Sequence, residues 1–389
     1  MNKVSILIFL HGLLGFSTVA IASVLSAITL VISLLLPFNT WICLALIALP
    51  CVVFASWFIK VVLYKQLNRK NSPFFFYAAL AMNLVFLCVA IITVRYIQTK
   101  GLSVGNMVSG LHKSYRLKYK DSFGLLADRG HKEKILQNYW EMKVLGPLFP
   151  AKGKHHGRVL NYQVNTYDFE SLKFLWEEIF LRQEYYFVTD FTKPFVIDCG
   201  SHIGMSVMYF KALYPDAQIL AFEPAPDHFR LLKMNIEQNA LEDVTLVNKA
   251  LANKEGTMKF YGDDWAIANL FENTRSGPNA TDVEVTRLSK YVNQSVDFLK
   301  MDIEGAEDMV LEDLVAADKL RLVKQMVIEY HHHLKKKVDS LSKFLKALEE
   351  NNFWYQIEAG YSQPYDKMVF QDIMIYAYQK QLPDTGKQE

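Results

Sequence analysis

Phe195-Val196-Ile197-Asp198-Cys199-Gly200-Ser201-His202-Ile203-Gly204 is an apolar run that leads into an acidic residue and then two glycines. An apolar run closed by glycines predicts a buried strand, a tight turn and then a helix. The glycines let the backbone bend sharply, and they let a ligand approach the N-terminus of the following helix. The stretch therefore predicts a nucleotide-binding turn.

The spacing Asp198-x-Gly200-x-x-x-Gly204 differs from the G-x-G-x-x-G of dinucleotide sites. It lacks the glycine that lets the backbone meet a pyrophosphate, so a ligand without a pyrophosphate is favoured. A second buried strand ends at Glu223, where the carboxylate is placed to bind ribose hydroxyls. Such turns also occur for packing alone, so these two strands do not decide the function.

A third buried strand runs into Lys300-Met301-Asp302-Ile303-Glu304-Gly305-Ala306-Glu307, which carries three carboxylates around a glycine. With this stretch the chain resembles the FkbM family of S-adenosylmethionine-dependent methyltransferases. Members of that family show a V-I-D-x-G-[AS]-[NH]-x-G turn, an F-E-P strand end and a K-x-D-x-E-G-x-E motif in this order. The resemblance covers about Arg158 to Tyr378. It departs at Cys199, where an aliphatic residue is commoner, and at Leu288-Ser289, where many members have Leu-Asp.

From Phe195 onward, strand and helix patterns alternate, which predicts a mostly parallel sheet with helices on both faces. The resemblance implies the α/β class I methyltransferase fold, a Rossmann-like seven-stranded, mostly parallel sheet. The run from Asp372 to Tyr378 would be the antiparallel strand that this fold adds. The predicted strands are 195–199, 218–223, 244–248, 297–302, 324–330, 353–358 and 372–378, and the predicted helices are 203–214, 226–238, 305–316 and 338–350.

The charge of the chain is divided unevenly along its length. Residues 1–120 contain eleven Lys or Arg and no Asp or Glu, whereas residues 121–389 contain 31 basic and 40 acidic side chains. The overall net charge of +2 therefore does not describe either part, and it does not indicate a nucleic-acid partner.

No charged residue occurs between Lys3 and Lys60, a stretch too long for the core of a signal peptide. A bilayer span needs about 20 apolar residues. We therefore expect residues 1–100 to be a membrane anchor of two or three transmembrane α-helices that precedes the α/β domain. One candidate span lies within Val4–Leu36, a second lies within Trp41–Phe58 or a little beyond, and the third is Phe74–Val94.

The basic residues on the two sides of the third candidate span conflict over its orientation. The basic flanks Lys60–Lys70 and Arg95–Lys120 should both be cytoplasmic. The segment between them is therefore re-entrant or lies in the membrane interface, or one basic flank is translocated against the rule. The implied cofactor is made in the cytosol, so we expect an integral membrane protein with a cytoplasmic catalytic domain. The other predicted parts are a juxtamembrane connector with one or two surface helices, the methyltransferase domain and a polar tail, at 101–157, 158–380 and 381–389.

The ligand of an open parallel sheet lies at the carboxyl ends of the strands, near the point where the strand order reverses. The resemblance implies S-adenosyl-L-methionine, with Asp198 and Gly200 at its amino-acid end, Glu223 at its ribose and Asn248 near its adenine. In the family, the segment matching the acidic-aromatic helix Phe169–Tyr186 covers the cofactor, and Glu178 is a further candidate there. The predicted cofactor-binding residues are Asp198, Gly200, Ser201, His202, Gly204, Glu223, Asn248, Glu184 and Tyr185.

Methyl transfer depends on in-line placement of the acceptor, and a hydroxyl acceptor must also lose a proton to a histidine or carboxylate. Glu329-Tyr330-His331 resembles the family's E-x-H strand end, and alternation along a strand places Glu329 and His331 on one face. We expect His331, rather than His332, to be the base. Asp302 is expected where the methyl group points, with a helix cap as its alternative role. No metal site is predicted, and a His–Asp metal site is the less favoured alternative.

These observations predict a membrane-anchored S-adenosylmethionine-dependent O-methyltransferase. The resemblance implies the hydroxyl of a sugar or glycolipid as the acceptor, and the anchor suggests a lipid-linked or surface-glycan substrate. The expected partners are the membrane lipid bilayer and this substrate, with no nucleic acid; the sequence does not indicate an oligomeric state. The alternative is a membrane-tethered scaffold that binds the cofactor without catalysis. A nicotinamide dehydrogenase is disfavoured by the missing glycine.

Overall fold

The computed structural model describes residues 104–119, 123–145, 155–167, 169–261, 280–332, 340–359 and 371–380. The chain divides into two compact units, Met1–Phe149 and Pro150–Glu389. The predicted membrane spans and the polar tail lie outside the described residues. Within the described ranges, no helix combines the length and the apolarity needed to cross a membrane.

The described part of the first unit is a pair of helices joined by a short turn. Its elements are α4 (Val104–Tyr119), η1 (Gly124–Ala127) and α5 (Arg129–Leu145). The two helices are joined by a buried hydrogen bond, in which Trp140 Nε1 donates to Ser114 Oγ at 2.9 Å. Asp128 begins α5 by accepting the backbone N–H of His131 at 2.8 Å. Two helices thus lie in the predicted connector, whose place beside a membrane stays a prediction.

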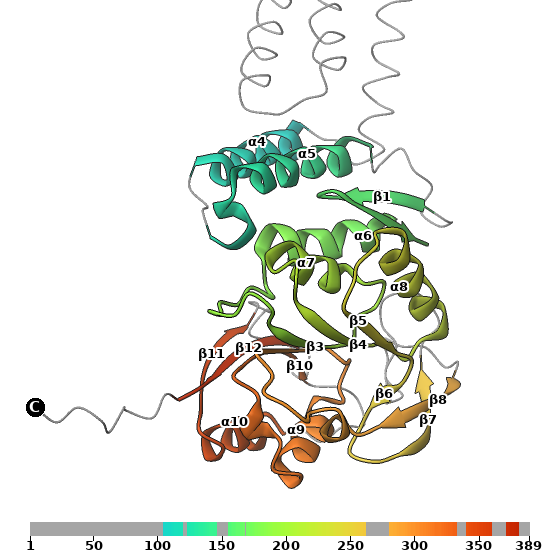
Figure 1. Ribbon diagram of the computed structural model, residues 1–389. Coiled ribbons are helices and arrows are strands. Elements are labelled where there is room, and N and C mark those ends of the chain that lie inside the picture. Colours follow the sequence, from blue (N-terminus) through green and yellow to red (C-terminus); the bar gives the residue numbers. More distant parts are fainter. Residues whose placement is uncertain are drawn as a thin grey trace, which may run out of the picture. The chain divides into compact units, whose positions relative to one another are not determined.

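The second unit is built on one large sheet (Figure 1). Its strands are β3 (Phe195–Cys199), β4 (Gln218–Phe222), β5 (Val244–Val247), β9 (Phe298–Met301), β10 (Gln325–His332), β11 (Phe353–Ala359) and β12 (Gln371–Gln379). The spatial order is β11-β12-β10-β9-β3-β4-β5, and only β12 runs antiparallel to its neighbours. The predicted seven-stranded, mostly parallel sheet is confirmed, including its antiparallel last strand.

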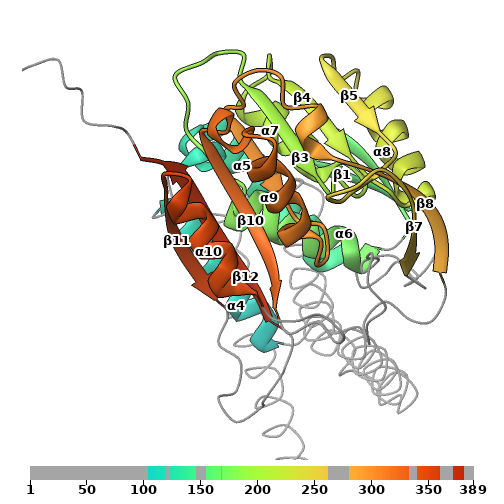
Figure 2. The same cartoon turned by 90° about the horizontal axis from the view of Figure 1, so that it is seen from below.

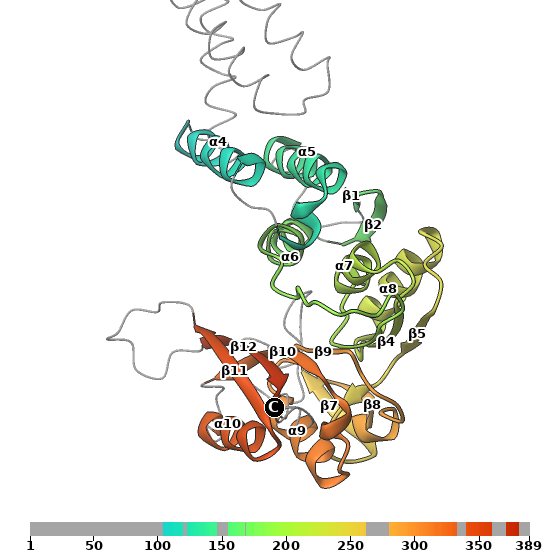
Figure 3. The ribbon, with the colours of Figure 1, turned by 60° about the vertical axis from the view of Figure 1, so that its left-hand side comes forward.

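Helices cover both faces of this sheet, as predicted. They are α7 (Met205–Leu213), α8 (Pro226–Gln238), α9 (Glu307–Ala316) and α10 (Leu341–Glu350). Figures 1 and 3 show α7 and α8 on one face and α9 and α10 on the other. Ile197 and Leu299, paired across the central strands, are both fully buried. Central strands covered on both faces need such continuous apolar runs, which is why the apolar pattern predicted them well.

The strand order reverses between β3 and β9. From β3 the chain moves outward through β4 to β5, and it returns to the other side of β3 with β9. Cys199 pairs with Phe222 on one side and Met301 on the other, so these three strands end at the same level. Ligands of open parallel sheets bind outside the carboxyl ends at such a reversal. The residues that follow these strands therefore lie together at the edge of the sheet where a ligand crevice is expected.

A hairpin and an irregular helix precede the large sheet. They comprise β1 (His155–Val159), β2 (Tyr162–Thr166), α6 (Phe169–Trp176) and the π-helix η3 (Glu177–Arg182). The predicted helix Phe169–Tyr186 therefore ends earlier, at Gln183, whose φ of 55° is left-handed. The predicted domain start, Arg158, lies inside β1. A π-helix inserts an extra residue into a helical turn, and such insertions often lie at functional sites.

A second, three-stranded sheet was not predicted. It consists of β6 (Ala250–Leu251), β7 (Gly256–Tyr261) and β8 (Ala280–Thr286), and short 3-10 turns follow at η4 (Leu288–Lys290) and η5 (Leu320–Leu322). Figure 2 shows β7 and β8 side by side. Phe260, Val283 and Val285 share a small core with Ala306 at the start of α9. These strands bury one face only, so their apolar signal is weaker than that of the central strands.

Candidate functional site

The glycine turn after β3 has the predicted conformation. Gly200 and Gly204 have φ values of 88° and 91°, which are left-handed. The N–H groups of Gly200 and Ser201 donate to the carbonyl oxygen of Phe222 at 3.0 and 2.8 Å, which fixes the turn to the end of β4. A Cβ on Gly200 would lie 1.8 Å from the carbonyl oxygen of Asp302. Glycine is therefore required here by the backbone after β9.

Asp198 lies beneath this turn and is fully buried. Ser206 Oγ, in the first turn of α7, donates to Asp198 Oδ2 at 2.5 Å, and Ser201 Oγ donates to the Asp198 carbonyl at 3.1 Å. The carboxylate thus supports the turn and the start of α7 from below. Direct contact of this carboxylate with a cofactor stays a prediction.

Glu223 follows β4 on the other side of the turn and is 5% exposed. Its Oε2 accepts the His202 N–H at 2.8 Å, and its Oε1 accepts the Ala225 N–H at 2.9 Å. Burial raises the pKa of Glu223 to about 7, although both N–H groups oppose this effect. A carboxylate has about four acceptor directions, so capacity for two ligand hydroxyls remains. The predicted ribose carboxylate therefore has the chemistry for that role.

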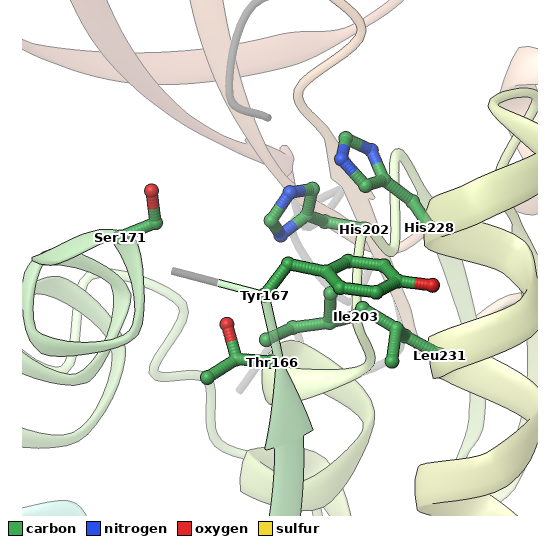
Figure 4. Close-up of a pocket in the computed structure, with 7 residues that line it drawn as sticks. All are labelled: Thr166, Tyr167, Ser171, His202, Ile203, His228 and Leu231. Atoms are coloured by element: carbon green, nitrogen blue, oxygen red, sulfur yellow. The ribbon is translucent and has the colours of Figure 1, made fainter. Parts of the chain in front are cut away.

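A pocket lies beside the glycine turn (Figure 4). Its walls are Thr166, Tyr167, Ser171, His202, Ile203, His228 and Leu231. The rings of His202 and His228 meet edge to face with centroids 4.1 Å apart, and His228 Nδ1 lies 3.8 Å from Glu223 Oε1. Tyr167 adds a third ring and accepts a hydrogen bond from Arg230. Ring faces and edges of this kind pack well against flat ring systems.

Two other positions marked by the sequence are bound to neighbouring parts of the fold. Asn248 Nδ2 donates to the carbonyl oxygens of Glu223 and Pro224 at 2.8 and 3.1 Å, so it braces the end of β4. Its predicted contact with adenine stays a prediction. Ser289, where many family members have Asp, donates from its N–H and its Oγ to Asp313, both at 2.8 Å. This arrangement gives Ser289 a structural role.

At the place of the expected ligand crevice, beyond β9 and β10, lies an acidic cluster that contains both predicted catalytic residues. His331 Nδ1 lies 2.9 Å from Glu307 Oε1, while its Nε2 lies 3.3 Å from Glu304 Oε2 and 3.9 Å from Asp302 Oδ1. The Asp302 side chain is 25% exposed, whereas that of His331 is 2% exposed. Asp302 is therefore the more accessible of the two, with His331 behind it.

The predicted alternation along β10 is confirmed. His331 faces the carboxylates that follow β9, whereas Tyr330 Oη is 3.2 Å from Ser340 Oγ at the start of α10. The cap role considered for Asp302 is not seen, because α9 begins only after Ala306 and that position has no side-chain cap bond. Glu307 instead accepts the N–H of Gly305 at 2.9 Å.

The crevice holds more carboxylates than cations, and this shifts several pKa values. Burial lowers the pKa of His331, but Glu307 and Glu304 raise it by more, so it lies well above the usual value. Burial, followed by the charge of Asp302, raises the pKa of Glu329 well above its usual range. Burial and then Glu184 raise the pKa of Glu178 to about 8. The imidazolium form of His331 is thus favoured, and it must lose a proton before it can act as a base.

Glu184 and Tyr185, predicted to touch the cofactor, lie beside this crevice. Arg182, the last residue of η3, pairs with Glu178 at 3.0 Å and with Glu184 at 2.9 Å. The Tyr185 ring is buried, and its centroid is 5.2 Å from Lys300 Nζ. The π-helix therefore brings this segment to the ends of the central strands.

Sequence reasoning assigned no role to three residues that the structure brings into the crevice. Lys300 is 2% exposed, and its Nζ donates to the carbonyl oxygen of Gly200 at 2.6 Å. It opens the K-x-D-x-E-G-x-E motif, so a signal was present. Glu329 opens E-x-H and also had a signal. Asp372, whose Oδ1 is 3.8 Å from His331 Nε2, comes from β12 and had none.

The same side chains offer a potential set of metal ligands. Among the described residues, ligand atoms of Asp302, Glu329 and His331 all lie within 4.8 Å of one another. Carboxylate and imidazole donors suit several divalent cations. The prediction that no metal binds remains untested, and chelation measures it directly.

The fold, the glycine turn and the acid-bearing strand ends define a class I methyltransferase domain. A model of the family described as "Methyltransferase FkbM domain" matches residues 198–355. Methyltransferase sdnD of Sordaria araneosa is 30% identical over 194 residues, which cover 40% of this chain and 74% of that protein. 31-O-demethyl-FK506 methyltransferase FkbM of Streptomyces tacrolimicus is 28% identical over 194 residues, covering 41% and 74%. The chain belongs to the FkbM family of methyltransferases.

Solved structures superpose on this chain with low scores. The precorrin-6y C5,15-methyltransferase of Geobacter metallireducens GS-15 gives a TM-score of 0.30 at 15% identity, covering 48% of this chain and 81% of that chain. The M. jannaschii TYW2 structure gives 0.34 at 13% identity, covering 60% and 89%. The family assignment depends on the sequence relatives.

Proposed function

We propose that this protein is a membrane-anchored S-adenosyl-L-methionine-dependent O-methyltransferase that acts on a hydroxyl of a sugar or glycolipid. The observation that carries the proposal is the convergence of the Gly200 turn, Glu223 and Asp302 on one crevice where the strand order reverses. A methyltransferase needs a methyl donor, and a nucleoside donor without a pyrophosphate suits this turn.

The residues around the turn fit such a donor. Glu223 has acceptor capacity left for the ribose hydroxyls, and the rings of Tyr167, His202 and His228 border the nucleoside side. The turn at Gly200 would hold the amino-acid end with its backbone, while Asp198 supports it from below. When bound, S-adenosyl-L-methionine supplies an electrophilic methyl group.

The chain's own catalytic contribution is to place the acceptor and take its proton. The carboxylate of Asp302 is the accessible group at the end of β9, so we assign proton removal from the hydroxyl to it. The favoured imidazolium of His331 lies behind it and supplies positive charge. The sequence-based hypothesis makes His331 itself the base. The two assignments give opposite pH trends, so the pH dependence of turnover separates them.

Support for the acceptor and the anchor comes from the sequence and from one relative. The name of the Streptomyces tacrolimicus relative specifies an O-demethyl acceptor, which supports transfer to oxygen. The uncharged stretch between Lys3 and Lys60 supports spans within residues 1–100. The proposed cofactor is made in the cytosol, which supports a cytoplasmic catalytic domain. An enzyme tethered at the bilayer meets lipid-linked hydroxyls readily.

Calorimetry and label transfer test this function on the full-length protein in detergent. S-adenosyl-L-methionine should bind at one site and NAD should not. Methyl-labelled S-adenosyl-L-methionine should then label the glycolipid fraction of a membrane extract, with and without EDTA to measure metal dependence. Binding of NAD alone, or of neither ligand, contradicts the proposal. Binding without transfer to glycolipid or soluble glycan identifies the scaffold alternative.

A further inference from the structure

Lys300 is a buried cation that contacts both sides of the proposed site. Its Nζ donates to the carbonyl oxygens of Gly200 at 2.6 Å and Cys199 at 3.4 Å. The same atom lies 3.5 Å from Asp302 Oδ2 and 3.5 Å from Asp198 Oδ1. The side chain comes from β9, where Lys300 pairs directly with Asp198 of β3. One ammonium therefore joins the turn after β3 to the carboxylate after β9.

Packing alone does not explain a lysine at this position. A buried ammonium is costly unless its contacts compensate for lost hydration, and an apolar side chain of similar length would fill the same space. Asp198 Oδ1 has no hydrogen-bond partner among the described residues, so Lys300 is its charge partner. Burial lowers the pKa of Lys300, but Asp302 and Asp198 raise it by more, so the ammonium stays charged.

The contacts indicate what this charge does. Lys300 Nζ donates to the carbonyl oxygen of Gly200 inside the fold. This hydrogen bond fixes the orientation of the peptide group between Gly200 and Ser201 in the turn. By attracting Asp302 Oδ2, Lys300 leaves Oδ1 on the side of His331, whose Nε2 is 3.9 Å away. The turn and Asp302 also approach through their backbones, since the Asp302 N–H donates to the Cys199 carbonyl at 3.0 Å.

We propose that Lys300 is a positioning residue that locks the cofactor turn to the acceptor-side carboxylate of Asp302. This inference rests on the proposed function, because it assigns the two sides of the crevice to cofactor and acceptor. This positioning role requires a compact ammonium group that contacts two carbonyl oxygens and two carboxylates at the same time. The larger planar guanidinium of arginine keeps the charge but does not fit the same contacts.

The chain offers a matched control in Lys211. It is also a buried lysine, 5% exposed, and its Nζ donates to the carbonyl oxygens of Ala217 at 2.5 Å and Pro215 at 3.3 Å. These carbonyls immediately precede β4, so they lie at the amino ends of the strands, away from the crevice. Loss of Lys211 should therefore affect stability alone.

The test compares wild type, Lys300→Met, Lys300→Arg and Lys211→Met as full-length proteins in detergent. Calorimetry measures the Kd for S-adenosyl-L-methionine. Label transfer to the glycolipid fraction of a membrane extract, at saturating S-adenosyl-L-methionine, measures the rate. For Lys300→Met we expect a Kd raised at least about tenfold and a rate lowered about 100-fold or more, the range of lost positioning. Lys300→Arg should recover part of both, and Lys211→Met should change only the Tm.

Unchanged affinity or an unchanged saturated rate in folded Lys300→Met overturns the inference, since the lock must serve both sides. If Lys300→Met does not fold, Lys300→Arg decides: weaker binding together with a slower rate supports the lock, and wild-type values overturn it. If Lys211→Met loses as much affinity and rate as Lys300→Met, the losses reflect general destabilisation, and the inference is overturned. If the wild-type protein binds no S-adenosyl-L-methionine, the result contradicts the proposed function and not the role of Lys300 in particular.

Discussion

At the scale of single residues, the tightest constraint is at Gly200. Its left-handed φ and the approach of the Asp302 carbonyl leave no room for a Cβ, so any side chain must displace backbone. Sequence reasoning attributed this glycine to a sharp backbone bend and to the approach of a ligand. The structure adds that the fold itself requires it, and a Gly200 variant therefore does not separate cofactor binding from folding.

Gly200→Ala should destabilise the protein by at least about 4 kcal/mol, enough to prevent folding in a marginally stable domain. Gly256→Ala is the matched control, because Gly256 also has a left-handed φ, of 123°, but nothing lies within 4 Å of its Cβ position. We expect about 1–2 kcal/mol there. Urea unfolding measures both. Equal losses of unfolding free energy in the two variants would show that the left-handed backbone conformation, and not the contact with the Asp302 carbonyl, causes the destabilisation.

The pH dependence of turnover separates the two roles considered for His331. If Asp302 takes the proton beside a charged His331, the rate should fall as pH rises through the raised pKa of His331, because the imidazolium is lost. If His331 is the base, the rate should rise over the same range. Either role predicts a loss of roughly 10²–10⁴-fold in His331→Ala. His332→Ala, on the other face of β10, should keep both rate and profile.

Asp302→Asn tests the carboxylate while keeping its shape. No cap bond depends on Asp302, and Lys300 keeps Asp198 and two carbonyl oxygens as partners. We therefore expect stability to change by no more than about 1 kcal/mol and most activity to disappear. Affinity for S-adenosyl-L-methionine should be retained, which distinguishes this variant from Lys300→Met. Calorimetry and label transfer on one preparation give both readings. An active Asp302→Asn enzyme would contradict the assignment.

Through Glu223, we expect cofactor affinity to depend on pH near neutrality. Its pKa of about 7 means that the apo carboxylate becomes protonated as pH falls below 7, and a protonated carboxyl loses acceptor capacity for ribose hydroxyls. Affinity for S-adenosyl-L-methionine should therefore fall with falling pH, approaching about tenfold per unit for a single linked proton. Calorimetry from pH 8 to 6 measures it. Glu223→Gln should bind weakly at every pH and abolish this dependence.

At the scale of elements, Asn235 of α8 joins the hairpin to the cofactor turn. This fully buried side chain accepts the N–H of Asn165 in β2 at 2.7 Å and donates to the Asn165 carbonyl at 3.1 Å. It also donates to the carbonyl of Ile203 at 2.8 Å, inside the turn. Asn235 therefore fixes the position of β2 beside the pocket from inside the fold.

Asn235→Ala should cost about 3 kcal/mol or more, since it leaves several buried backbone groups unpaired. Asn239→Ala removes similar bonds, to the N–H and carbonyl of Gln163 at 2.8 and 2.7 Å, but at an exposed position where water replaces them. We expect less than about 1 kcal/mol for that control. Thermal unfolding compares the two. Equal losses would show that the burial of Asn235 is not what matters.

At the scale of the whole molecule, the second unit has its own core. A fragment of residues 150–389 should fold alone, because the large sheet carries helices on both faces and the core lies between them. A fragment that begins at Arg158 removes the first half of β1 and should be less stable. Circular dichroism and thermal unfolding check both fragments. If 150–389 is soluble only with the apolar N-terminal segments attached, the boundary is wrong.

The sequence by itself determined the seven-stranded sheet, its helices and the family. Buried parallel strands have continuous apolar sequences, such as the run that begins at Phe195, and the glycines and acidic residues that follow indicate where each strand ends. The same local rule placed Glu329 and His331 on one face of β10. The one-sided strands β7 and β8 have no such run, and they were missed.

Only the tertiary structure decided what these residues meet. The burial of Asp198 and His331, the raised pKa of Glu223 and the contacts of Lys300 all depend on strands that are far apart in sequence. Asp372 reaches His331 because β12 pairs with β10 antiparallel. Charge and solvation at a site are sums over every neighbour in space, and a linear pattern of residues does not contain that sum.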